Sequence, residues 1–127
     1  MLKVKIKDIE FNSPIIASSG TFGYGYEANG FVDLSKIGCI ITKSITLDPR
    51  EGNPSPRIHE SRSGMINAIG LANVGVEEFC KAKLRKLNSI NTSFIISIAG
   101  STIEDYIKVI NIIEEHNGMH VGYEVNV

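Results

Sequence analysis

Short apolar runs are spaced along the chain, and most of them fit β-strands. Near the start, Leu2, Val4 and Ile6 alternate with lysines, which predicts a short strand with one exposed face. Four later runs are apolar at consecutive positions, so both faces of each strand should be buried, as in a parallel sheet that helices cover. These four predicted strands span residues 14–18, 39–42, 94–98 and 121–127.

Three stretches between these runs predict helices. Ser101 and Glu104 have the spacing of a capping box, and an apolar stripe at helical spacing begins at Ile103. A second helix is predicted over residues 76–87, where acidic residues come first and basic residues follow, the order that the helix dipole favours. A weaker pattern predicts a third helix over residues 26–34.

The order of these elements predicts an α/β fold. One short N-terminal strand precedes about four parallel strands and three helices. This matches the N-terminal half of a (β/α)8 TIM barrel, because a complete barrel needs about 250 residues. Residues 1–127 are therefore expected to form a single domain that is truncated within a barrel. The final residues read as a buried strand, whose edges need partners from later chain or from another molecule.

Composition limits the function classes. Apolar residues make up 43% of the chain and charged residues 21%, with a net charge of −1, as in an ordinary globular protein. We expect a cytoplasmic protein that binds neither nucleic acid nor membrane, since no basic cluster and no apolar run of about 18 residues is present. Cys39 and Cys80 lie in apolar surroundings without metal-ligand spacing, so both are expected to be reduced core residues and no metal site is predicted.

One motif resembles a nucleotide-binding fingerprint. Gly23, Gly25 and Ala28 satisfy the pattern G-x-G-x-x-G/A. Residues 20–22 separate the motif from its strand, however, and Lys43 follows the next strand where an acidic ribose ligand would be required. We therefore do not assign a dinucleotide site.

A long connection over residues 45–73 is the strongest candidate for function. In a barrel, a loop that follows the carboxyl end of a strand lies on the catalytic face. An exposed polar loop would not need Ile69 and Leu71, so the segment is expected to fold back over a pocket. The alternative is a loop that only packs its own residues.

Five motifs in order along the whole chain resemble dihydroorotate dehydrogenases. They cover residues 14–23, 42–46, 50–57, 64–73 and 97–101, with the sequences PIIASSGTFG, TKSIT, REGNPSPR, GMINAIGLAN and SIAGS. The wording is most similar to the NAD-linked, two-subunit branch, in which an FMN-bearing barrel pairs with a subunit carrying FAD and a [2Fe–2S] cluster. A single-subunit, fumarate-linked branch shares the same early motifs. The resemblance implies oxidation of dihydroorotate to orotate in de novo pyrimidine (UMP) biosynthesis, with hydride transfer to FMN.

The same resemblance implies roles for individual residues. The substrate-binding residues it implies are Lys43, Asn67, Ala68, Ile69, Gly70, Leu71 and Asn126. The FMN-binding residues it implies are Ser19, Gly20, Lys43, Ser44, Ser97 and Asn126. Ser97 departs from the family pattern, since relatives often carry an asparagine there.

The general base of this branch is a cysteine in the pattern Asn-x-Ser-Cys. Asn126 and Val127 match the first two positions, so the cysteine is expected beyond Val127 and no catalytic residue is assigned. Residues 1–127 alone are therefore predicted to be inactive. His59, His116 and His120 are expected to be surface or loop residues. The alternative function is a non-catalytic half-barrel that self-associates or binds another chain, and a homo-oligomer is expected in either case.

Overall fold

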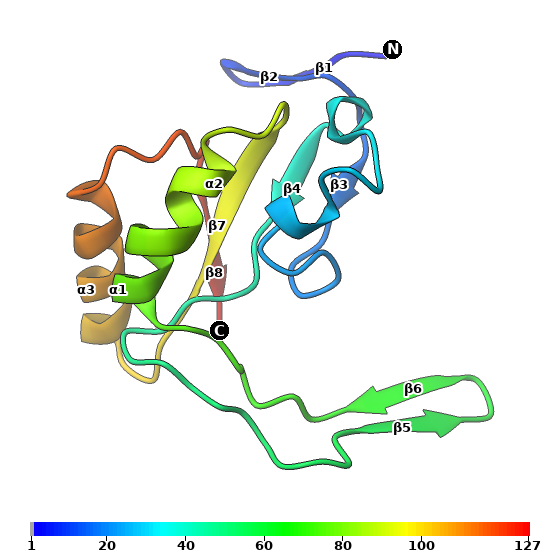
Figure 1. The fold of residues 1–127 in the computed structure, drawn as a ribbon, viewed down its shortest axis with the longest axis vertical. Coiled ribbons are helices and arrows are strands. Elements are labelled where there is room, and N and C mark those ends of the chain that lie inside the picture. Colours follow the sequence, from blue (N-terminus) through cyan, green and yellow to red (C-terminus); the bar gives the residue numbers. More distant parts are fainter. Residues whose placement is uncertain (1) are drawn as a thin grey trace.

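The computed structural model describes residues 2–127. Its centre is a four-stranded parallel sheet with the order β3-β4-β7-β8 (Figure 1). The strands are β3 (Ile16–Ala17), β4 (Cys39–Ile41), β7 (Ser93–Ala99) and β8 (Tyr123–Asn126). Four parallel strands joined by crossovers confirm the predicted α/β class and the predicted strand positions.

The helices pack against one face of this sheet (Figure 1). Residues 76–87 form one continuous helical segment, made of α1 (Val76–Glu78), a π-helical stretch (Phe79–Leu84) and α2 (Arg85–Leu87). Helix α3 spans Ile103–Glu114. Strands and helices share one core, whose buried side chains include Ile40, Phe94, Ile96 and Ile98 from the strands and Phe79, Leu87, Val109 and Ile113 from the helices.

The capping box of α3 lies one residue later than predicted. Thr102 is the N-cap, and its side chain accepts a hydrogen bond from the Asp105 backbone N–H at 3.2 Å. The Asp105 carboxylate in turn accepts from the backbone of Ser101 and Thr102, at 2.9 and 3.0 Å. The predicted apolar stripe is confirmed in part, because Ile113 is buried and Tyr106 and Ile110 pack against the core. Ile103 and Ile107 are 74% and 52% exposed, so the stripe begins later than predicted.

The predicted helix over residues 26–34 is wrong. Two short 3-10 turns replace it, Tyr26–Ala28 and Leu34–Lys36. Gly30 adopts φ of +96° between them, a backbone conformation that ends a helix. The Asp33 side chain then accepts from the Ser35 N–H and starts the second turn. Two helical segments, rather than three, therefore accompany the sheet.

Two antiparallel hairpins accompany the sheet (Figure 1). The first pairs β1 (Val4–Ile6), which was predicted, with β2 (Ile9–Phe11), which was not. The second pairs β5 (Ile58–Ser61) with β6 (Gly64–Asn67), inside the connection that was expected to be irregular. This second hairpin projects from the body of the molecule at the end of two irregular segments (Figure 1). Residues 47–72, which comprise these segments and the hairpin, are called the arm below.

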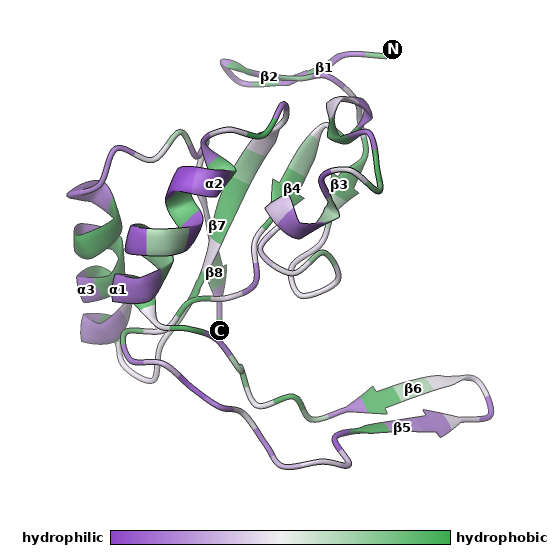
Figure 2. Cartoon of the chain, viewed as in Figure 1, coloured by the Kyte–Doolittle hydropathy of each residue, from purple (hydrophilic) through white to green (hydrophobic). Residues whose placement is uncertain are grey.

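Burial of the strands depends on their place in the sheet. The central strands β4 and β7 are largely apolar in Figure 2, and their core-facing residues are fully buried. At the two edges, Ile15, Ile16 and Val125 remain 61%, 45% and 56% exposed. The prediction that all four strands are buried on both faces is therefore wrong for β3 and β8, because no other part of residues 2–127 covers these side chains. Within residues 2–127, no helix is both long and apolar enough to cross a membrane.

Candidate active site

A cavity of about 720 Å³ opens where the carboxyl ends of three strands meet the arm. This volume lies in the range of small-molecule sites. Its sheet side is polar, with Ser19, Gly20, Thr21, Lys43, Ser44 and Asn126. Its arm side is largely apolar, with Ile58, Met65, Asn67, Ala68, Ile69, Gly70, Leu71 and Ala72.

The turn after β3 supplies the first part of the wall. Thr21 closes it, because its hydroxyl donates to the Ser18 carbonyl oxygen at 2.7 Å. Gly20 has φ of +78°, and no atom lies within 4 Å of the position that a Cβ would occupy there. A residue with a side chain would be strained by its backbone and not by crowding. Gly20 thus faces open space in the cavity, and Ser19 lines the cavity beside it.

Lys43 follows β4 and is half-buried in the wall. No carboxylate among residues 2–127 forms an ion pair with its ammonium group. A half-buried cation without an internal counterion favours an anionic ligand, since the ligand supplies the charge that the protein lacks.

A chain of four polar side chains lies beneath the polar wall. The Asn126 amide donates to Ser44 Oγ at 3.0 Å, and Ser44 Oγ lies 2.9 Å from Ser97 Oγ. Ser97 in turn donates to Glu124 Oε1 at 2.7 Å. Ser97 is fully buried and does not line the cavity, unlike the other residues expected to bind FMN. Glu124 carries no motif signal, and sequence reasoning missed it.

The arm holds residues 67–71 against the cavity by backbone contacts. The Asn53 side chain donates to the Ala68 carbonyl oxygen at 2.8 Å, and its backbone N–H donates to the Ile69 carbonyl oxygen at 3.0 Å. Gly70 and Leu71 both adopt positive φ, +77° and +55°. A Cβ on Gly70 would lie 2.8 Å from the Asn53 nitrogen, so glycine is required for this close approach.

Asn73 fastens the base of the arm, a role that sequence reasoning also missed. Its Oδ1 accepts from the backbone N–H groups of Thr46 and Gly75, at 3.2 and 2.8 Å. Its Nδ2 donates to Thr46 Oγ1 and to the Leu71 carbonyl oxygen, both at 2.8 Å. Both ends of the long connection are thereby joined through one buried amide.

The chain matches the family model described as dihydroorotate dehydrogenase over residues 1–127. The chain belongs to the dihydroorotate dehydrogenase family. It is 46% identical over its full length to a protein of Thermodesulfovibrio yellowstonii named dihydroorotate dehydrogenase B (NAD(+)), catalytic subunit, and covers 42% of that protein. Proteins of the same name from Endomicrobium trichonymphae and Geobacter metallireducens are 42% and 43% identical. These matches use 93% and 99% of this chain and cover 39% and 41% of the two relatives.

The chain thus spans about two fifths of the length of these curated relatives. A crystal structure of the dihydroorotate dehydrogenase of Eimeria tenella in complex with ferulenol shares the fold, with a TM-score of 0.66 at 21% identity. The match covers 88% of this chain and 33% of that one. The four-stranded sheet therefore corresponds to part of the barrel of a dihydroorotate dehydrogenase.

Both cysteines of this dihydroorotate dehydrogenase homologue are free and buried, as the sequence predicted. Neither lines the cavity. Burial raises the pKa of each thiol to about 11, so both are protonated at neutral pH. Among residues 2–127, no group of three or more His, Cys, Asp or Glu side chains could hold a metal ion.

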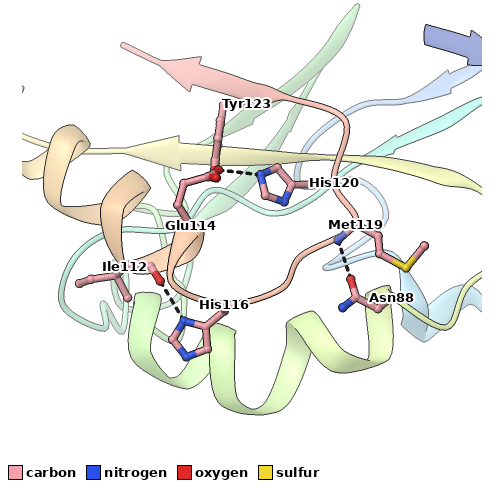
Figure 3. Close-up of polar contacts among 7 residues, drawn as sticks. All are labelled: Asn88, Ile112, Glu114, His116, Met119, His120 and Tyr123. Atoms are coloured by element: carbon pink, nitrogen blue, oxygen red, sulfur yellow. Dashed lines mark hydrogen bonds and ion pairs between the residues drawn. The ribbon is translucent and has the colours of Figure 1, made fainter.

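The histidines lie away from the cavity lining. His59 is exposed, and His116 bonds to the Ile112 carbonyl oxygen at 2.8 Å through Nδ1 (Figure 3). His120 lies in a loop, as predicted, but its side chain is only 9% exposed. Its Nε2 lies 3.3 Å from Glu114 Oε1, which also accepts from the Tyr123 hydroxyl at 2.5 Å (Figure 3). This cluster joins α3 to the approach to β8.

Proposed function

We propose that this protein is the FMN-dependent catalytic subunit of a dihydroorotate dehydrogenase, which oxidises dihydroorotate to orotate in pyrimidine biosynthesis in the cytoplasm. The observation that carries the proposal is the position of Lys43. A cation without an internal counterion stands on the polar wall of a cavity whose opposite wall is largely apolar. An anionic, flat heterocycle has the matching chemistry.

The donor set of the cavity also fits a flavin. A flavin ring offers two apolar faces and a polar edge, and the cavity combines aliphatic side chains with serine, amide and ammonium groups. Ser19, Gly20, Lys43, Ser44 and Asn126 would hold FMN, and Ser97 would act on it only through Ser44. FMN, when bound, supplies the acceptor for the hydride that leaves the substrate.

Lys43 and Asn126 would also contact the substrate, and residues 67–71 would complete its site. Lys43 would bind the carboxylate of the substrate, because its ammonium group has no carboxylate partner in the described part of the protein. Asn67 can donate to a carboxylate oxygen and accept from a ring N–H with the same amide. Ala68, Ile69, Gly70 and Leu71 would cover the ring and exclude water, since they complete the arm side of the cavity.

We also propose that the protein works with a second, electron-transferring subunit. The named relatives are catalytic subunits of NAD-linked enzymes, which supports a second subunit that carries FAD and a [2Fe–2S] cluster. The fumarate-linked branch remains the alternative for the electron acceptor.

A second candidate function rests on the sheet edges. Ile15, Ile16 and Val125 are large apolar residues that stay about half exposed or more at β3 and β8. Such edges favour association with another copy or another chain. In that case residues 1–127 form a non-catalytic half-barrel. We also propose that these residues alone do not turn over dihydroorotate, because both of their cysteines are buried outside the cavity and neither can serve as the base.

The first experiment is an intact mass and a visible absorption spectrum of the protein purified at its natural length. A bound flavin spectrum that dihydroorotate bleaches would support the enzyme. A colourless protein of 13.9 kDa that elutes as an oligomer would support the half-barrel instead. A colourless protein well above that mass would count against both.

The Lys43→Met variant tests the cation. Loss of one charged hydrogen bond should weaken orotate binding by about tenfold to a hundredfold, measured by perturbation of the flavin spectrum. Lys108→Met, which removes an exposed lysine of α3, is the matched control and should bind as the wild type does. Equal affinities of Lys43→Met and Lys108→Met would overturn the assigned role.

A further inference from the structure

The polar chain beneath the cavity has one permitted direction. Each serine hydroxyl carries one hydrogen, whereas a glutamate carboxylate only accepts hydrogen bonds. The Ser97 hydrogen must therefore point to Glu124 Oε1, 2.7 Å away. Ser97 Oγ can then only accept, so the hydrogen of Ser44, 2.9 Å away, must point to Ser97.

The same constraint reaches Asn126. Because the Ser44 hydrogen is committed to Ser97, Ser44 Oγ can only accept from the amide, and Asn126 must turn Nδ2 toward it at 3.0 Å. The two ends of an asparagine amide are nearly equal in shape, so hydrogen bonding decides which end faces which neighbour. Asn126 lines the cavity, and this orientation leaves its carbonyl oxygen Oδ1 and one N–H hydrogen for a ligand.

We propose that Glu124 is a positioning residue, which fixes the orientation of the Asn126 amide through Ser97 and Ser44 and so makes the cavity select a ligand with an N–H donor at that point. The proposal rests on the proposed function, since a dihydropyrimidine or flavin ring edge offers such donors. Glu124 itself lies outside the cavity lining and would touch no ligand there. Its carboxylate acts at the far end of the chain, three hydrogen bonds from Nδ2.

Register explains why these groups meet. Ser97 pairs with Glu124 and Ala99 with Asn126 in the parallel ladder of β7 and β8. Paired residues of a parallel ladder point to the same face, so Glu124 and Asn126 both share the face of Ser97. Ser44 reaches this face from the end of β4, and the fully buried Ser97 excludes water from the middle of the chain. Water therefore cannot offer Ser97 another hydrogen-bond partner, and the direction of the hydrogen bonds that Glu124 sets is kept along the chain.

The decisive variant is Glu124→Gln. A glutamine amide can donate to Ser97, which lets every hydrogen in the chain reverse and lets Asn126 turn Nδ2 to the cavity. Orotate affinity should fall by roughly tenfold, the usual effect of one mismatched buried hydrogen bond. Binding is measured in the flavin-loaded, full-length protein from the change in its visible spectrum, with Glu115→Gln as the exposed control, which should match the wild type.

A double-mutant cycle separates positioning from general stability. Ser97→Ala breaks the chain, so Glu124→Gln should change affinity by less than about twofold in that background. Effects that multiply in the double variant, or a Glu124→Gln protein that binds as the wild type does, would overturn the proposal. The wild type tests the proposed function separately. If it binds neither flavin nor orotate, the proposed function is refuted, whereas the direction of the hydrogen-bonded chain is not.

A neutron structure of the wild type tests the chain without any variant. Deuterium on Ser97 should point to Glu124, deuterium on Ser44 should point to Ser97, and the Nδ2 group of Asn126 should face Ser44. The opposite direction at either serine would refute the proposal, even if Glu124→Gln fails to fold.

Discussion

The buried side-chain amide of Asn73 should contribute more to the free energy of unfolding than its small size suggests. Asn73→Ala removes four hydrogen bonds, two accepted by Oδ1 and two donated by Nδ2. At about 1 kcal/mol for each, the free energy of unfolding should fall by about 4 kcal/mol. Asn73→Asp keeps the two accepted bonds but turns a buried, charged carboxylate oxygen toward the Leu71 carbonyl oxygen, so it should lose at least as much stability as Asn73→Ala. Asn73 is 8% exposed, so water does not readily replace these partners.

Urea unfolding followed by circular dichroism measures these losses in the full-length protein. Asn53→Ala is the matched control, because it removes one exposed hydrogen bond and should lose under about 1 kcal/mol. Limited proteolysis adds a local readout, since Asn73→Ala should speed cleavage within residues 47–72 before the sheet unfolds. The reasoning is refuted if Asn73→Ala loses no more stability than Asn53→Ala, or if Asn73→Asp is clearly more stable than Asn73→Ala.

The remaining predictions concern backbone strain and buried thiols. Gly70→Ala should lower the free energy of unfolding by about 1–3 kcal/mol and weaken orotate binding, because φ is +77° and the new Cβ would crowd the arm. Gly64→Ala is the control. Its Cβ meets open space, so it should be near neutral in the same urea and binding assays. Cys39 and Cys80 should resist alkylation at pH 8 in the native protein and react after unfolding, as peptide mass spectrometry would reveal; rapid native labelling would contradict their burial. The pKa of each thiol is about 11 in the folded protein and 9.0 ordinarily, so the unfolded chain loses these protons at lower pH. Stability should therefore fall as the pH rises from 9 to 11. Urea midpoints that stay constant across that range would argue against the raised pKa values.

A few residues of the cavity wall could be located from local patterns in the sequence, and most of the others only from the family resemblance. Lys43 follows an apolar strand, and Ile69 and Leu71 are apolar residues in an otherwise polar loop. Both patterns can be recognised within a few residues of sequence, and all three residues line the cavity. The roles of these residues in binding FMN and substrate stay predictions. Local signals were less reliable at the helices, where the capping box of α3 shifted from Ser101 to Thr102 and the 26–34 helix was replaced by 3-10 turns.

Two features could not be read from the sequence because they join residues far apart in it. Asn73 and Thr46 are 27 positions apart, and Asn126 and Ser44 are 82 apart. Each of these side chains has an ordinary loop or strand-end context by itself. The β5–β6 hairpin was missed for another reason, since its strands are exposed on both faces and lack the alternation that marks a half-buried strand.

The sequence by itself determined the α/β class, the parallel strands and the family, because apolar runs and motif spacing are properties of short segments. Tertiary structure alone decided which side chains meet. The register of β7 and β8 places Glu124 against Ser97, and the arm's base closes on Asn73. Hydrogen bonds between distant segments depend on where the whole chain packs, and burial then makes their direction and their energy matter.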